Sequence, residues 1–443
     1  MQYLGLKKIS GSIVTLEGVT SPPPSYEEIV NISLENHPTR TGRVIQVSGN
    51  TAVVLVFEGT SGMSLANTAT TFTGKVMEIS LSSGILGRTF DGLGRPRDGL
   101  GEVSLHIKRA ISGQPTNPTN RIYPRNYIHT GFSAIDGLAT LIRGQKLPIF
   151  SADGLPHDRL AAQIAVQANI IGASISKPES FAVVFAAMGA KHDTAEFFRR
   201  VFEESGTIDR TVMYLNLAND PPTERIATPR YALTAAEYLA YDLGYHVLVI
   251  LTDMTAYAEA VREISSANGE IPSRKGYPGY LYSDLASIYE RAGIVKHSKG
   301  SLTQIPILTM PGEDITHPVP DLTGYITEGQ IVLDRQLAQR GIYPPINVLP
   351  SLSRLMKDGI GEGYTSPDHP KLAGLLFANY AQVSDVRALV SIIGEDDLTE
   401  HDKSLLEFGH RFESEFVNQQ AFENRSLDET LEIARKLLAS VVQ

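Results

Sequence analysis

The sequence contains no cysteine. Disulfides and thiolate metal sites are therefore excluded, and a chain without thiols is compatible with a reducing cytoplasm. It also has no apolar run near the roughly 18 residues that a membrane span requires. Its first residues lack the charged start and long apolar centre of a signal peptide. We therefore expect any role at a membrane to come through a partner.

Positive charge is also scarce. The chain has 39 Lys and Arg residues against 49 Asp and Glu residues, a net charge of −10, and no polybasic segment. This balance argues against a general nucleic-acid-binding protein. The histidines His192, His297, His317 and His401 have no metal-ligand spacing, so no metal site is predicted.

The chain begins with short β-branched runs that are separated by turn residues. They predict strands over residues 13–16, 28–32, 42–47 and 52–57. Short strands at close, regular spacing are typical of a small β-barrel, which we expect to end near Ser80.

The middle of the chain alternates apolar strands with helices. The predicted strands are residues 146–150, 181–187, 211–217, 246–252 and 304–310, and the predicted helices are 158–171, 194–204, 224–243, 255–267 and 280–292. Uniformly apolar strands between helices indicate a parallel sheet covered on both faces. Ligands of such sheets bind beyond the carboxyl ends of the strands.

The last part of the chain is helical. Apolar residues recur at helical spacing over residues 371–393, 400–417 and 427–441, and Asp397 or Thr399 can cap the second helix. We therefore predict a multidomain α/β chain with three parts in this order: a small N-terminal β-barrel (1–75), a central parallel α/β domain (76–355) and a C-terminal helical bundle (356–443).

The segment after the first central strand has the position of a phosphate-binding loop but not its residues. That loop, G-x-x-x-x-G-K-[ST], offers backbone N–H groups, a lysine and a metal-binding hydroxyl. Here Ser151 and Pro156 occupy the two glycine positions, and proline has no N–H. His157 replaces the lysine, and histidine as a residue type has no permanent positive charge at pH 7; Asp158 replaces the hydroxyl, and only Gly154 is a glycine. An ordinary strand-to-helix turn unrelated to nucleotides explains this segment alone equally well.

Other segments decide between these interpretations. Eight of them together resemble the B subunit, the non-catalytic beta chain, of V-type and archaeal A-type rotary ATPases: residues 57–62, 86–96, 143–151, 216–221, 225–230, 274–282, 321–330 and 348–355. The match runs in order over nearly the whole chain, and the loop Ser151-x-x-Gly154-Leu155-Pro156-His157 belongs to that family's own pattern. The resemblance implies a barrel, a RecA-like domain of the P-loop type with a degenerate loop, and a helical bundle.

The resemblance also implies a role for Arg354 in the motif Ser351-Leu352-Ser353-Arg354. In the family this arginine reaches across an interface to the neighbour's ATP, so Arg354, Ser351 and Ser353 are the expected nucleotide-contacting residues. A guanidinium stays charged and binds phosphate oxygens in pairs, and such arginine fingers are worth roughly 10³–10⁵ in rate. A structural arginine in an interface ion pair would be the better interpretation without the motif.

Two further positions concern catalysis. Asp253 ends a core strand at a Walker-B-like position, where a carboxylate would orient Mg²⁺; a cap for the helix that begins near Thr255 is an equally good interpretation. Ala190 stands where catalytic relatives carry the glutamate that activates water, and alanine has no acid–base chemistry.

The predicted function is that of a non-catalytic B subunit in a rotary ATPase or ATP synthase. The resemblance implies alternation with catalytic A subunits in an A3B3 head, contact with central-stalk and peripheral-stalk subunits, and coupling to H⁺ or Na⁺ transport through the membrane rotor. We expect no cofactor on this chain alone, ATP and Mg²⁺ in the neighbouring subunit, no nucleic acid, and a peripheral location at the cytoplasmic face of the membrane. The alternatives are a free-standing export-type ATPase, which the missing lysine, hydroxyl and glutamate disfavour, and a Rho-like ring motor, which the net charge disfavours.

Overall fold

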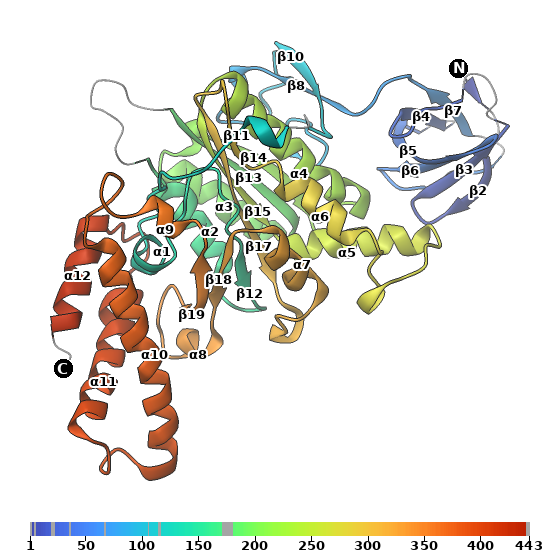
Figure 1. Cartoon of the computed structure of the whole chain (residues 1–443). Helices are drawn as coiled ribbons and strands as arrows, with labels where there is room; N and C mark the ends of the chain where they lie inside the picture. Colours follow the sequence, from blue (N-terminus) through green and yellow to red (C-terminus); the bar gives the residue numbers. More distant parts are fainter. Residues whose placement is uncertain are drawn as a thin grey trace.

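The computed structural model describes residues 2–3, 6–18, 23–34, 37–65, 68–104, 106–113, 117–170 and 180–439. Figure 1 shows a strand-rich N-terminal part at one end, an α/β part in the middle and a helical part at the other end. The predicted fold class is therefore confirmed, while the predicted domain boundaries stay predictions. The expected helix ends at Ile171 and Val441 lie outside the described residues.

The N-terminal domain is one antiparallel sheet in the order β1-β7-β4-β5-β6-β3-β2. Its strands are β1 (Gln2–Tyr3), β2 (Leu6–Ser10), β3 (Ile13–Glu17), β4 (Ile29–Leu34), β5 (Arg40–Ser48), β6 (Thr51–Val56) and β7 (Thr68–Phe72). Burial alternates along β4, so Val30 and Ile32 face a core that they share with Val14 and Val54. The strand near Ser80 is not part of this sheet: β8 (Glu78–Leu81) pairs with β10 (Ile107–Ala110) instead.

The central sheet has the order β19-β18-β12-β17-β15-β13-β14-β9; in addition, β16 pairs with β17, and β11 pairs with β16. Its strands are β9 (Thr89–Asp91), β11 (Arg121–Ile122), β12 (Ile149–Ser151), β13 (Phe181–Ala190), β14 (Thr211–Leu217), β15 (His246–Thr252), β16 (Gly293–Val295), β17 (Ser301–Thr309), β18 (Gly329–Leu333) and β19 (Ile346–Ser353). The strands from β18 to β9 are parallel, as expected, but β19 runs antiparallel to β18 and β16 antiparallel to β17.

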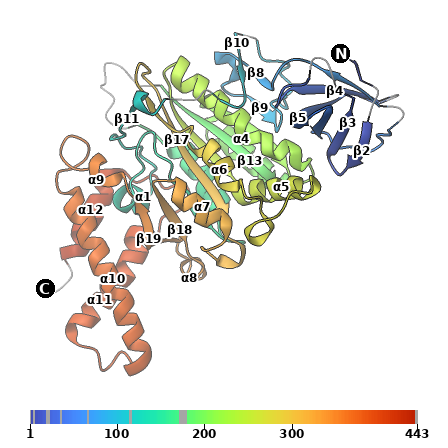
Figure 2. The ribbon, with the colours of Figure 1, turned by 45° about the vertical axis from the view of Figure 1, so that its right-hand side comes forward.

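Helices cover both faces of this sheet. Val183 and Phe185 of β13 lie in one core with α2 and α3, whereas Val184 and Ala186 lie in a second core with α4, α5 and α6. In Figure 2, α4, α5 and α6 lie over one face of the sheet. The helices are α1 (Ser133–Leu138), α2 (His157–Gln167), α3 (His192–Glu204), α4 (Pro222–Glu237), α5 (Met254–Ala267), α6 (Leu281–Tyr289), α7 (Pro318–Ile326), α8 (Arg335–Gln339) and α9 (Met356–Gly359). The predicted single helix 224–243 is instead α4 followed by a π-helical turn, Tyr238–Asp242.

The C-terminal domain consists of α10 (His369–Ile393), α11 (Glu400–Arg411), which continues as a π-helical turn (Phe412–Val417), and α12 (Leu427–Ala439). Thr399 caps α11 in a reciprocal pair with Asp402, so of the two expected caps it is Thr399 that serves. Phe412 and Leu431 belong to the same core as α1 and α2, so this domain is packed onto the central one. Within the described residues, no helix is both long and apolar enough to cross a membrane.

Candidate functional site at two edges of the central sheet

The loop at residues 151–158 lies at the carboxyl end of β12 and leads into α2. Ser151 is fully buried, and its hydroxyl is hydrogen-bonded to Nδ1 of His157 at 2.9 Å. Pro156 occupies the N-cap position of α2 and makes no side-chain capping bond. The groups that stand at the first glycine position and the lysine position of a phosphate loop therefore bind each other.

The loop backbone is also engaged. The N–H groups of Leu155 and His157 donate to carbonyls inside the loop, at 3.1 and 2.9 Å. Gly154 has a φ of +80°, the left-handed conformation that turns the chain back. Arg335 of α8 donates to the carbonyl of Asp153 at 2.7 Å and pairs with Glu313. The sequence holds no local signal for this arginine, because it lies 182 residues from Asp153.

Asp253 lies at the same edge, one strand beyond β17. Its carboxylate accepts the N–H of Thr255 at 2.6 Å as the N-cap of α5, and it also accepts the hydroxyl of Thr309. Burial raises the pKa of Asp253, and the hydrogen bonds from Thr309 and Thr255 oppose that rise. Both carboxylate oxygens have partners in this chain. Among the described residues there is no group of three or more acidic or histidine side chains placed to hold a metal ion.

Ala190 ends β13 at this edge and offers no acid–base group. The side chain of Asn216 lies beside it. The Oδ1 atom of Asn216 accepts hydrogen bonds from the N–H of Gly189 at 3.0 Å and from Nε of Arg225 at 2.9 Å. The structure therefore places an amide and a guanidinium here. Sequence reasoning does not single out these two residues individually, although both lie in segments that carry the family resemblance.

Arg354 lies at the opposite edge of the sheet, the one at which the parallel strands begin. Strand β19 is antiparallel to β18, and its Ser353 pairs with Gly329 at the start of β18, whereas β12 runs beside the end of β18. At about 3.3 Å per residue, the register separates Arg354 from Ser151 by roughly 16 Å along the strands. Arg354 is exposed, and its guanidinium donates a hydrogen bond to the carbonyl of Thr327 at 3.3 Å. In the described part of the chain it has no acidic partner, so its charge is available to a group outside the chain.

The two serines of the motif use their hydroxyls within this chain. Ser351 accepts the N–H of Val332 at 2.9 Å, at a bulge where the β18–β19 ladder shifts register. Ser353 donates to the carbonyl of Thr140 and accepts Nε2 of Gln145, both at 2.9 Å. In this structure both side chains hold the strand that carries Arg354.

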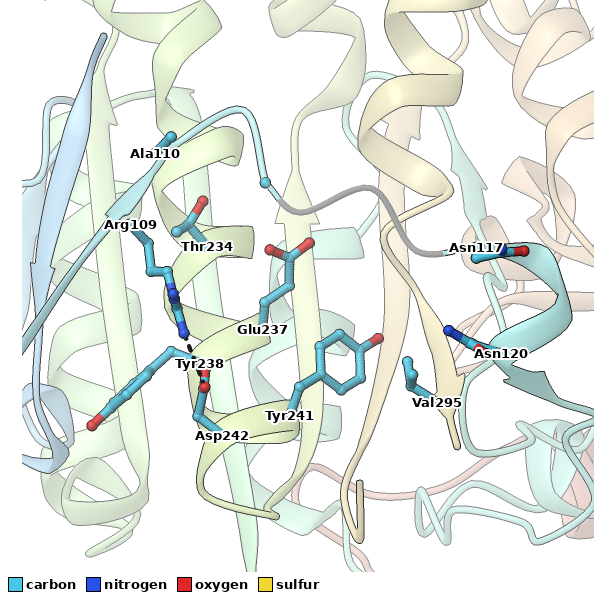
Figure 3. A pocket seen from close by; sticks show the side chains of 11 residues that line it. Arg109, Ala110, Asn117, Asn120, Thr234, Glu237, Tyr238, Tyr241, Asp242 and Val295 are labelled. Carbon is cyan, nitrogen blue, oxygen red and sulfur yellow. Dashed lines mark hydrogen bonds and ion pairs between the residues drawn. The ribbon is translucent and has the colours of Figure 1, made fainter. Parts of the chain in front are cut away.

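Two cavities lie away from these edges. The first, of about 370 Å³, is bordered by β10, α4 and its π-helical turn, where Arg109 and Asp242 form an ion pair of 3.1 Å (Figure 3). The second, of about 440 Å³, lies between the barrel and α4, α5 and α6. Of the described residues that line these two cavities, none is a predicted site residue.

Comparison with known proteins places this geometry in a family. The chain matches the β-barrel domain of the ATP synthase alpha/beta family over residues 6–74, the nucleotide-binding domain of that family over 131–353, and the C-terminal domain of V and A type ATP synthase over 358–443. It is 60% identical to V-type ATP synthase beta chain 2 of Clostridium tetani, over 99% of this chain and 94% of the relative. It is 54% identical to the B subunit of the A-type ATP synthase of Nitrosopumilus maritimus, over 100% of this chain and 94% of the relative.

A solved structure agrees with these relatives. It is described as a unique ATP synthase subunit, NeqB, from Nanoarcheaum equitans, and it superimposes with a TM-score of 0.76 at 40% identity, covering 94% of this chain and 99% of that one. The resemblance seen in the eight sequence segments is thereby confirmed. The chain belongs to the family of the B subunits, or beta chains, of V-type and A-type ATP synthases.

Proposed function

We propose that this chain is a non-catalytic subunit of the head of a rotary ATPase or ATP synthase, and that it supplies Arg354 to the ATP site of a neighbouring catalytic A subunit. The observation that carries the proposal is the contrast between the two sheet edges. At one edge Ser151, His157 and Asp253 use their polar groups on one another or on the chain. At the other edge Arg354 is exposed, and within the described residues its guanidinium contacts a backbone carbonyl and no carboxylate.

The chemistry follows from these groups. Without a lysine, a metal-binding hydroxyl or a general base, the loop does not stabilise a transferring phosphoryl group. A guanidinium from outside can do so in the neighbour's site, because it places two donors on the oxygens where charge develops. ATP and Mg²⁺ would then be held by the A subunit, and this chain alone would carry no cofactor.

The wider setting is part of the same proposal. Alternating A and B subunits would form a six-membered A3B3 head, joined to central-stalk and peripheral-stalk subunits at the cytoplasmic face of the membrane. ATP hydrolysis or synthesis in the head would be coupled to H⁺ or Na⁺ transport by the membrane rotor. Export-type catalysis is disfavoured by the missing lysine, hydroxyl and glutamate, and nucleic-acid translocation by the net charge of −10.

The direct test is Arg354→Ala in the complex reassembled with the A subunit. We expect assembly to be retained and kcat for ATP hydrolysis to fall by roughly 10³-fold or more, since a transition-state contact is lost. Arg199→Ala, which removes an exposed arginine of α3 paired with Glu196 and Glu203, is the matched control and should leave kcat within about twofold. Near-normal turnover by the Arg354 variant, or ATP hydrolysis by the isolated chain, would contradict the proposal.

A further inference from the structure

Gln145 lies just before β12 and is fully buried. Its Nε2 donates to the hydroxyl of Ser353 at 2.9 Å and to the carbonyl of Glu328 at 3.1 Å. Its Oε1 accepts the N–H of Ile142 at 2.9 Å. Both ends of this carboxamide are therefore used, and they join three segments of the central domain at the edge where Arg354 lies.

Glu328 is the second part of the same network. Its carbonyl, which accepts Gln145, also accepts the N–H of Arg354 at 2.9 Å, and its own N–H donates to the carbonyl of Lys146 at 3.1 Å. Its carboxylate accepts the N–H of Lys146 at 2.9 Å and pairs with the buried ammonium of Lys146 at 2.8 Å. The hydrogen bond from the Arg354 N–H to the Glu328 carbonyl is thus supported at both of its ends: Gln145 binds Ser353, and both Gln145 and Lys146 bind Glu328.

The side chain of Arg354 has much less support than its backbone. Its bond to the Thr327 carbonyl is long, at 3.3 Å, and the residue is exposed. The direction in which the side chain leaves the domain is therefore set mainly by the backbone of residues 353 and 354. Because a displacement of about 1 Å can cost roughly 100-fold in rate, small movements of that backbone matter.

We propose that Gln145 is a positioning residue for Arg354: its carboxamide fixes Ser353 and the Glu328 carbonyl, and through them the point from which the guanidinium reaches a neighbouring nucleotide. The inference rests on the proposed function of Arg354 and adds to it a buried residue that touches no nucleotide. Gln145 acts at once on the residue before Arg354 and on the carbonyl that accepts the Arg354 N–H, which an ordinary packing residue does not do.

The test uses Gln145→Met in the reassembled complex. Methionine keeps the length of the side chain and removes its donor and acceptor. We expect kcat for ATP hydrolysis to fall by about 10- to 100-fold with KM changed less than about threefold, since only the transition-state contact is displaced. Gln163→Met is the matched control: Gln163 of α2 is also fully buried, but its side chain accepts the hydroxyl of Tyr343 and donates to the carbonyl of Glu423, and kcat of this variant should stay within about threefold.

A double-mutant cycle separates positioning from general packing. In the Arg354→Ala background, Gln145→Met should lower kcat by less than about twofold, because the group it positions is gone. Ser353→Ala removes the other end of the same hydrogen bond with minimal change of volume. It should lower kcat in the same direction, and it decides the question if the Gln145 variant does not enter the complex.

Three failures are distinguishable. If Arg354→Ala turns over ATP normally, the arginine has no catalytic role and the inference falls together with the proposed function. If Arg354→Ala is impaired while both Gln145→Met and Ser353→Ala keep a normal kcat, the arginine role stands and positioning by Gln145 is wrong. An equal loss from Gln145→Met with and without Arg354 would show that Gln145 acts by another route, and would also overturn the inference.

Discussion

Among single residues, Glu224 is a carboxylate with unfavourable surroundings for its charge. It lies at the start of α4, where the barrel meets the central domain: the neighbouring Thr223 donates to the carbonyl of Phe57. Burial raises the pKa of Glu224 to about 7, and the nearby charges of Asp91 and Asp220 add to the rise. The folded chain therefore holds a proton between about pH 4.5 and 7 that the unfolded chain has lost.

This shift predicts the effect of Glu224→Gln. Because the folded-state pKa is raised, the free energy of unfolding falls as pH rises from about 4.5 to about 7, and the full cost of the buried charge is present above pH 7. The amide removes that cost, so the variant should be more stable than the parent by about 1–2 kcal/mol at pH 8, after allowance for partial exposure, and little changed at pH 5. Thermal unfolding of the full chain at both pH values measures this. An equal effect at the two values would contradict the assignment.

Asp98→Asn is a control of opposite sign. Hydrogen bonds from Arg88 and from backbone N–H groups outweigh burial and hold the pKa of Asp98 at about 2. Its contribution to stability is present above the unfolded pKa of about 3.9 and lost only below that value. The variant should therefore be destabilised equally at pH 5 and pH 8.

At the scale of elements, the strand pair β18–β19 carries the candidate site. Gly329 begins β18 with a φ of +138°, and a Cβ there would overlap the carbonyl oxygen of Leu352. Only glycine allows the two strands to approach this closely beside Ser353 and Arg354.

Gly329→Ala should therefore push β19 away from β18. We expect a loss of about 2–3 kcal/mol in the free energy of unfolding, from backbone strain and from the displaced strand, and a lower kcat in the reassembled complex. Chemical denaturation of the full chain measures the first effect. Gly324→Ala in α7 is the control, because a Cβ there meets only Phe150 at 4.0 Å, and it should be neutral or slightly stabilising. Equal stability of the two variants would show that the close approach at residue 329 is unimportant.

The elements also show what the sequence can predict. The apolar pattern predicts the strands at residues 211–217 and 246–252 with their observed bounds, because each is an uninterrupted buried run. The same pattern does not predict strands β18 and β19. Strand β19 is the last strand of the sheet and contains polar residues and Pro350, and a register shift breaks the alternation between β18 and β19. Their pairing depends on contacts that no local pattern records.

The same limit applies to the site. The residue types at 151, 156 and 157 predict a loop that has lost the groups of a phosphate site, because that argument needs only side-chain chemistry. The placement of Arg354 at the other sheet edge depends on the antiparallel direction of β19. The contacts of Gln145 join residues 183 and 208 positions apart, so local sequence patterns cannot predict them.

On the scale of the whole molecule, a buried carboxylate joins the helical domain to the central one. Glu413, in the π-helical turn after α11, pairs with Arg340 beyond α8 at 2.6 Å and with Arg387 of α10 at 2.7 Å. Tyr380 donates to the same carboxylate at 2.7 Å. Burial alone would raise the pKa of Glu413, but the bonds from Arg387 and Tyr380 bring it below its ordinary value.

Glu413→Gln should loosen the attachment of the helical domain. Two arginines would lose their counter-charge, at a cost of about 2–3 kcal/mol above pH 5, and the difference from the parent should shrink as pH falls below the unfolded pKa of about 4.3. Hydrogen exchange of α10–α12 in the full chain, compared with that of the barrel, would locate the loss. Glu415→Gln removes the exposed pair with Arg411 and should cost less than about 1 kcal/mol. A similar loss from both variants would contradict the central role of Glu413.

The two edges of the sheet carry different groups, and this difference limits the symmetry of the contacts that the molecule can make. When the Arg354 end and the loop end of the sheet bind different neighbours, these contacts do not follow a two-fold axis, because such an axis joins one patch to its own copy. Contacts that use both edges are head-to-tail contacts, in which one edge of a chain meets a different patch on its neighbour. An assembly built from such contacts is closed only when it forms a ring. In such a ring the neighbour on the Arg354 side and the neighbour on the loop side meet different chemistry, so two interfaces made of the same pair of chains would not be equivalent.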